Sequence, residues 1–188
     1  MHGGRQAGEA ELVRRVRKED PGAARMLYEA HAGWLSAVCS RYLTDPDEVK
    51  DILQESFIKI FSGIGRFEWR GEGSLRAWMR RIVVNEALMR LRERSRSAET
   101  VFGAAEFPEP ADDSGPDAEG IPAPVLHEMI RALPEGYRTV FNLHVFEQKS
   151  HREIAELLGI SENTSCSQLS RARALLARKI EEYRKDDR

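Results

Sequence analysis

Cysteine is scarce in this chain, which has two cysteines among 188 residues. Because Cys39 and Cys166 lie far apart in the sequence, they predict neither a disulfide framework nor a cysteine metal site, as is typical of a protein from the reducing cytosol. No apolar run approaches the length of a membrane span, and the N-terminal residues lack the apolar core of a signal peptide. We therefore expect a cytoplasmic protein with no membrane insertion.

Patterns typical of catalysis are also missing. His127, His144 and His151 do not form the metal-ligand spacing of two histidines one helical turn apart, and no glycine-rich phosphate or dinucleotide fingerprint is present. The sequence therefore predicts no enzyme, no metal and no cofactor. A net charge of −2 gives no support to nucleic-acid binding by the chain as a whole, so any basic surface must be local.

Helical periodicity dominates the remaining sequence, and no segment alternates as a strand would. The expected fold class is all-α, with two small helical domains at residues 9–96 and 125–183. Residues 97–124 are rich in Pro, Gly, Ala and acidic side chains and contain no Lys, Arg or His. This composition predicts a flexible acidic linker, either a passive spacer or a functional segment. The terminal residues 184–188 are expected to be frayed.

In the first domain, Asp45 and Ser74 are expected to cap helices, and a break is expected at residues 20–22. The helix around residue 55 places several side chains off its apolar stripe, and Ile58 is the one apolar member among them. This set suggests a docking patch, although an ordinary acidic surface is the alternative. Its members are Asp51, Gln54, Glu55 and Ile58.

The segment 66–73 places Phe67 and Trp69 between arginines in a glycine-containing loop. Aromatic rings stack on unpaired bases, but the two rings could instead seal the core beneath the loop. The next helix and its exit form the densest positive patch of the chain, which suits phosphate contact or a solvated face. Its arginines are Arg76, Arg80, Arg81, Arg90, Arg92, Arg94 and Arg96.

Residues 150–173 predict two short helices joined by a tight turn. Ser150 and Glu153 form a capping-box pattern, Gly159 suits the helix stop, and Ser161 can cap the second helix. One face of that second helix is apolar, and the other carries small polar residues and arginines, as in helices that enter a major groove. An ordinary antiparallel helix pair is the alternative. The polar face and its flanks comprise Asn163, Thr164, Cys166, Ser167, Ser170, Arg171 and Arg173.

Two stretches in this order resemble sigma-70 family factors. DEVKDILQESFIKIF, then GRF, then RGEGSLRAWMRRIVVNEALMRLRER is similar to their region 2. LPEGYRTVFNLHVFEQKSHREIAELLGISENTSCSQLSRARALLARKI is similar to their region 4. With an acidic linker between them, the pair resembles the compact extracytoplasmic-function (ECF) class. The resemblance implies a transcription initiation factor that reads minus-ten and minus-thirty-five promoter elements and helps melt DNA.

The resemblance also implies roles for individual residues. Asp51, Gln54, Glu55 and Ile58 would bind the clamp of the largest subunit of core RNA polymerase, and the flap of the polymerase is a further implied docking site. The implied minus-ten residues are Phe67, Trp69, Arg76, Arg80 and Asn85. The implied minus-thirty-five residues are Asn163, Thr164, Cys166, Ser167, Ser170, Arg171 and Arg173. Further implied partners are promoter DNA and an anti-sigma factor, and the free protein is expected to be a monomer.

This sequence departs from the family pattern at two positions. Ser165 stands where an aliphatic residue is common, and Cys166 stands where Lys or Arg is common, so the preferred minus-thirty-five sequence stays open. Two other functions remain as alternatives: a stand-alone helix-turn-helix regulator, and a mimic that titrates an anti-sigma factor.

Overall fold

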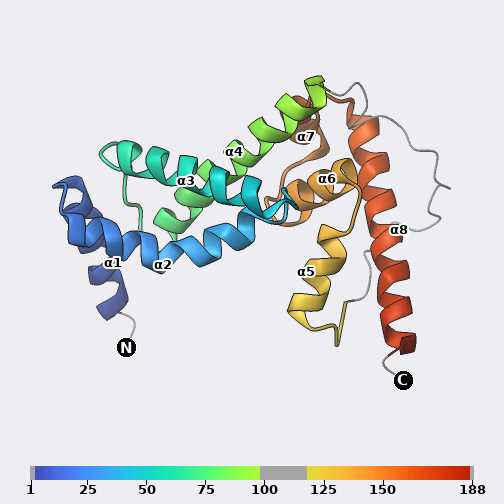
Figure 1. Cartoon of the computed structure of the whole chain (residues 1–188), viewed down its shortest axis with the longest axis horizontal. Coiled ribbons are helices and arrows are strands. Elements are labelled where there is room, and N and C mark those ends of the chain that lie inside the picture. The colour runs from blue at the N-terminus through green and yellow to red at the C-terminus, as the bar shows by residue number, and fades with distance from the viewer. Residues whose placement is uncertain (1–2, 98–117, 187–188) are drawn as a thin grey trace. The chain divides into compact units, whose positions relative to one another are not determined.

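The computed structural model describes residues 3–97 and 118–186, and the described residues form eight α-helices and no strand (Figure 1). The predicted all-α class is confirmed. Contacts divide the chain into two compact units, residues 1–89 and 90–188. Most of the predicted linker, residues 98–117, lies outside the described residues, so the domain boundaries stay a prediction. Within the described ranges, no helix is both long enough and apolar enough to cross a membrane.

Four helices begin in the first unit: α1 (Gly3–Arg17), α2 (Pro21–Cys39), α3 (Pro46–Gly63) and α4 (Ser74–Ser97). The side chain of Asp20 accepts hydrogen bonds from the Gly22 and Ala23 amides and so caps α2. Asp45 caps α3 by accepting from the Asp47 amide, and a proline follows each cap as the first helical residue. The predicted Asp45 cap is confirmed, and a break is present, but it spans residues 18–20, because Pro21 and Gly22 already belong to α2.

The core of this unit lies between α2, α3 and α4. Helices α2 and α3 run side by side in Figure 1 and contact each other along their apolar faces. Leu35 of α2, Ile60 of α3 and Met79 of α4 are fully buried, and each such side chain contributes roughly 1.5–3 kcal/mol of burial free energy. Lys59 on α3 also forms a 2.6 Å ion pair with the buried carboxylate of Glu86 on α4.

The predicted cap at Ser74 is wrong. Ser74 is the first residue of α4, and the Ala77 amide donates instead to the Gly73 carbonyl at 2.9 Å. The Ser74 hydroxyl donates to the Gly71 carbonyl at 2.7 Å and accepts from the Arg70 amide at 3.2 Å. Gly71 and Gly73 both have positive φ, so the loop curls back over Ser74 and takes up its hydroxyl.

The second unit contains α5 (Ala123–Arg131), α6 (Glu135–Val145), α7 (His151–Leu158) and α8 (Glu162–Asp186). Helix α8 packs against both α6 and α7. The buried guanidinium of Arg138 donates to the Arg131 and Leu133 carbonyls, both at 3.0 Å, and satisfies the end of α5. The prediction of a frayed terminus is wrong up to Asp186, and Arg184 donates to the Glu119 carbonyl at 3.0 Å.

Candidate functional site

The outer face of α3 presents the predicted docking patch. Its four members recur at helical spacing and are all exposed: Asp51, Gln54, Glu55 and Ile58. Ile58 keeps 62% of its surface exposed, the largest value among the large apolar side chains that the structure describes. The opposite face of α3 is buried through Ile52 and Ile60. The predicted exposure of Ile58 among polar side chains is confirmed, while its partner stays a prediction.

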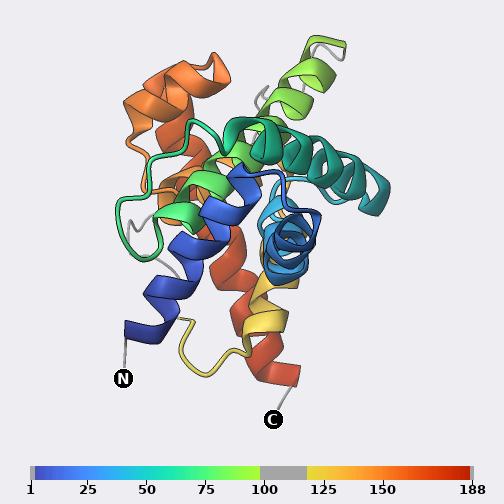
Figure 2. The same cartoon turned by 90° about the vertical axis from the view of Figure 1, so that its left-hand side faces the viewer.

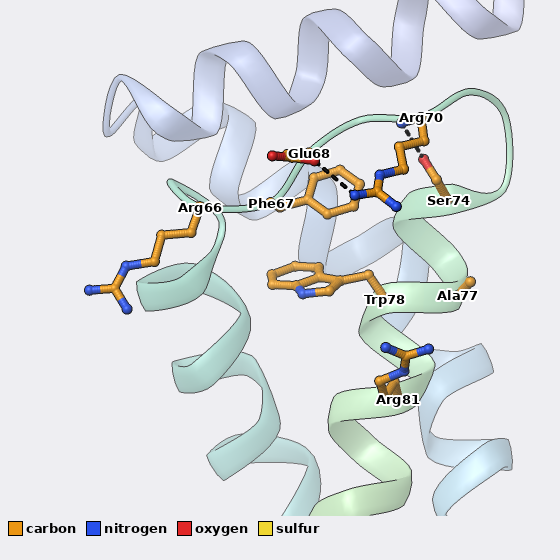
Figure 3. A pocket seen from close by; sticks show the side chains of 8 residues that line it. All are labelled: Arg66, Phe67, Glu68, Arg70, Ser74, Ala77, Trp78 and Arg81. Carbon is orange, nitrogen blue, oxygen red and sulfur yellow. Dashed lines mark hydrogen bonds and ion pairs between the residues drawn. The ribbon is translucent and has the colours of Figure 1, made fainter.

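A cavity of about 480 Å³ opens between the loop after α3 and the first turns of α4 (Figure 3). This volume lies within the usual range for ligand pockets. Three arginines and one glutamate surround it, so its rim is positive. The lining residues are Arg66, Phe67, Glu68, Arg70, Ser74, Ala77, Trp78 and Arg81.

The two aromatic residues of the loop have different environments. Phe67 is only 6% exposed, and its ring centroid lies 5.0 Å from that of Trp78 (Figure 3). Trp69 is 38% exposed. The core-sealing alternative therefore describes Phe67, whereas Trp69 is presented to solvent. A DNA contact by Phe67 stays a prediction that its burial does not favour.

Trp78 belongs to this surface but was not predicted as a site residue, and Arg81, predicted as part of the basic patch, was not assigned to the minus-ten set. Trp78 lies one turn inside α4, and a Cβ on Gly63 would come within 3.2 Å of its indole ring. The missed signal was the spacing of Trp78, Arg81 and Asn85, which places all three on one side of a helix. Asn85 is exposed there, as predicted.

The structure does not place all the predicted minus-ten residues on one surface. Arg76 precedes Asn85 by nine residues, which is about 180° around a helix. The Arg76 guanidinium lies 4.4 Å from the ring centroid of Trp34 in α2, a cation–π contact. Arg80, half-buried one turn later, shares the side of Arg76 rather than that of Asn85. The side chain of Arg96, which belonged to the predicted basic patch, lies outside the described residues.

The predicted start and stop of α7 are confirmed. The Ser150 hydroxyl accepts from the Glu153 amide at 3.2 Å, and the Glu153 carboxylate accepts from the Ser150 amide at 2.9 Å. A 2.5 Å hydrogen bond from Lys149, together with the hydrogen bonds from Ser150, lowers the pKa of Glu153 to about 2. Gly159 ends the helix with φ of 68°, in the left-handed region that suits glycine.

Helix α8 begins with the predicted cap, because the Ser161 hydroxyl accepts from the Thr164 amide at 3.0 Å. The predicted inward face is buried, with Ser165, Leu169, Ala172 and Leu176 as its members. The predicted outward face is exposed at Asn163 and Cys166. The other members are half-buried: Thr164, Ser167, Ser170, Arg171 and Arg173.

Two details of this helix pair were not predicted. The Nδ1 atom of His151 lies 2.9 Å from the Ser165 hydroxyl, which joins the start of α7 to the inner face of α8. The His151 ring stacks on that of His144 at 4.8 Å, so α6 is joined as well. On the outer face, the Ser167 hydroxyl donates to the Thr164 carbonyl at 3.1 Å. Since its hydrogen is used in this bond, the oxygen of the Ser167 hydroxyl can act as a hydrogen-bond acceptor toward another group.

Residues 27–97 match the family described as Sigma-70 region 2, and residues 125–176 match Sigma-70, region 4. The chain is also 30% identical to the ECF RNA polymerase sigma-E factor of Haemophilus influenzae, over 90% of this chain and 94% of that one. The chain belongs to the ECF class of sigma-70 factors. The RNA polymerase sigma-H factor of Pseudomonas aeruginosa is 29% identical, over 94% of this chain and 95% of that one. A solved structure of the sigma factor RpoE with the anti-sigma factor NepR from Bartonella quintana shows a TM-score of 0.46 at 22% identity, over 84% of this chain and 96% of that one.

This sigma factor is therefore a transcription initiation factor that directs RNA polymerase to promoters, and it is not an enzyme. The region 2 match begins within α2, so α1 lies outside it. The pocket, the Asn85 face and the outer face of α3 all lie within the region 2 match. The helix pair α7–α8 lies within the region 4 match up to residue 176.

Proposed function

We propose that this sigma factor docks on RNA polymerase through the outer face of α3, captures the minus-ten element at the pocket and the Asn85 face, and reads the minus-thirty-five element with α8. The proposal rests chiefly on one continuous surface of the first unit. There, an open pocket with aromatic and cationic side chains adjoins the exposed Asn85 on the same side of α4.

This surface has the two chemical properties that an unpaired promoter strand requires. The indole of Trp78 lines the pocket, and stacking of one base on an aromatic ring is worth about 1–3 kcal/mol. Arg66 and Arg81 at the rim suit backbone phosphates. Arg70 forms a 2.9 Å ion pair with Glu68, but both side chains are largely exposed, so DNA can displace this pair at little cost. Trp69 is a second stacking candidate, at the exposed part of the loop.

The two sides of α4 provide the test of the minus-ten assignment. Asn85→Ala should relax discrimination among minus-ten variants and lower the permanganate reactivity of the promoter bubble formed by holoenzyme. Arg76→Ala, on the opposite side beside Trp34, should leave minus-ten discrimination unchanged. Normal discrimination and a normal bubble with Asn85→Ala would refute the assignment.

The region 4 proposal rests on the outward face of α8. The capped N-terminus of this helix presents backbone amides, which suits a phosphate near Thr164. Further along, Ser167 is an acceptor toward the groove, and an acceptor suits the N6 amino group of adenine or the N4 amino group of cytosine. Arg171 is proposed as a base contact and Arg173 as a phosphate contact. Cys166 supplies no cation where many family members place one.

We also propose an oligomeric state, a location and a partner. The free protein is a monomer, it works in the cytoplasm with RNA polymerase, and an anti-sigma factor controls it. Membership of the ECF class of RNA polymerase sigma factors supports these proposals. We also propose 9–96, 97–124 and 125–183 as the region 2 domain, linker and region 4 domain. The two family matches fall within or beside these limits.

A further inference from the structure

Arg17, the last residue of α1, reaches across to the loop between α3 and α4. Its Nε atom donates to the Ile64 carbonyl at 3.1 Å, and an Nη atom donates to the Phe67 carbonyl. Figure 2 shows α1 running past this loop. Forty-seven and fifty residues separate the partners in the sequence, so these contacts belong to the tertiary structure alone.

The two carbonyls lie in the segment that positions the floor of the pocket. Ile64 is the C-terminal cap of α3, and the buried ring of Phe67 packs 5.0 Å from the indole of Trp78. Gly63 lies so close to the six-membered ring of that indole that a Cβ would come within 3.2 Å of it. A displacement of residues 63–67 would therefore move Trp78 and alter the pocket.

An arginine is well suited to fix this segment. Its planar guanidinium presents several N–H donors in a rigid fork, so one side chain reaches both carbonyls with one geometry. The Ile64 carbonyl, at the C-terminal cap of α3, accepts only a long 3.3 Å hydrogen bond from the Phe67 amide along the backbone, and the partial negative charge at this helix end is stabilised by a cation. A lysine offers a single flexible ammonium and would satisfy the pair less completely.

We propose that Arg17 is a positioning residue for promoter melting, which fixes the loop so that the pocket beside Trp78 is formed before DNA arrives. This inference rests on the proposed minus-ten role of the pocket. It places a determinant of region 2 function in α1, which lies outside the region 2 match. Arg17 itself need not touch the DNA.

The experiment uses holoenzyme assembled from the full chain and core polymerase. The selectivity ratio is measured as the affinity for a single-stranded minus-ten oligonucleotide divided by the affinity for a scrambled one. Arg17→Gln should lower this ratio about tenfold, the factor expected for roughly one net hydrogen bond from a charged donor. Arg17→Lys should retain part of the ratio. Arg14→Gln is the matched control, because Arg14 is exposed on α1 and pairs within that helix, with Glu11 at 2.6 Å.

Core affinity is measured on the same variants, and it should be unchanged in Arg17→Gln. An unchanged ratio in Arg17→Gln, in a series where Asn85→Ala lowers it, would overturn the role of Arg17 and leave the pocket assignment intact. If neither variant changes the ratio, both the inference and the proposed minus-ten surface fail. A parallel loss of core affinity and ratio in Arg17→Gln would also overturn the inference, because it indicates general destabilisation of the first unit.

Discussion

Truncation of Ile58 should weaken binding to core RNA polymerase without destabilising the protein. Full burial of an isoleucine side chain is worth about 1.5–3 kcal/mol, and 62% of this residue is exposed in the free protein. Docking can therefore add about 1–2 kcal/mol from this side chain, which is roughly a 5- to 30-fold change in Kd. Ile58→Ala should raise the Kd for core polymerase by that factor.

The assay is a titration of labelled core polymerase with the wild-type protein and with each variant, combined with thermal unfolding. Met26→Ala is the matched control, because Met26 is 52% exposed on α2 and lies outside the proposed interface. The Tm of Ile58→Ala should stay close to the wild-type value. An unchanged Kd, or an equal loss in Met26→Ala, would refute the docking face.

Three further predictions concern the DNA surfaces and pH. Trp69→Ala should reduce open-complex formation on duplex promoters, and a pre-melted bubble template should restore part of the activity; full activity on the duplex would show that this ring has no part in melting. Arg171→Ala should change the preference among minus-thirty-five variants, a base contact being worth about 1–3 kcal/mol, whereas Arg173→Ala should lower activity equally on all of them. If both variants behave alike in a promoter panel, the proposed division between base and phosphate contacts is wrong. Ionised Glu153 stabilises the folded protein, and its pKa is lowered from 4.5 to about 2. This contribution to stability is therefore fully present above pH 4.5 and is lost as the pH falls toward 2. The Tm difference between the wild-type protein and Glu153→Gln should therefore be constant near neutral pH and shrink below pH 4.5, and a difference that grows on acidification would contradict this reasoning.

Features fixed by a few neighbouring residues were predictable from the sequence. Asp45 before a proline, the Ser150–Glu153 pair and Gly159 each act on amides or carbonyls within one turn, and the structure confirms all three. The buried and outward faces of α8 also followed from helical periodicity, since Leu169 and Ala172 are buried as expected.

Features that depend on the path of a loop were not predictable in this way. Ser74 has the residue type of a cap, but the positive-φ glycines of the loop bring its hydroxyl to Gly71 instead. Phe67 and Trp69 stand two residues apart in a segment without periodicity, so the sequence could not say which ring is buried. The contacts of Arg17 require the tertiary structure, because their partners lie some fifty residues away.

The placement of Arg76 and Asn85 on opposite sides of α4 was missed for a different reason. Their spacing alone places them on opposite sides of a helix, but both fit the general expectation of a basic, polar DNA-binding helix. The prediction treated the helix as one surface, whereas the contact of Arg76 with Trp34 shows that one side packs toward α2. Residue type predicts a DNA-binding helix, and only the angular position of each residue distinguishes its two sides.

Run-off transcription is the decisive experiment for the initiation function of this protein. Purified core polymerase is combined with this protein on DNA that contains its promoter, and the transcript is compared with that from core polymerase alone. A sigma factor that works through these surfaces should give a specific start site that depends on the protein, and the transcript should weaken with Ile58→Ala and Asn85→Ala. Tight sequence-specific DNA binding by the protein alone, with no transcript when polymerase is added, would contradict this function and favour a stand-alone regulator.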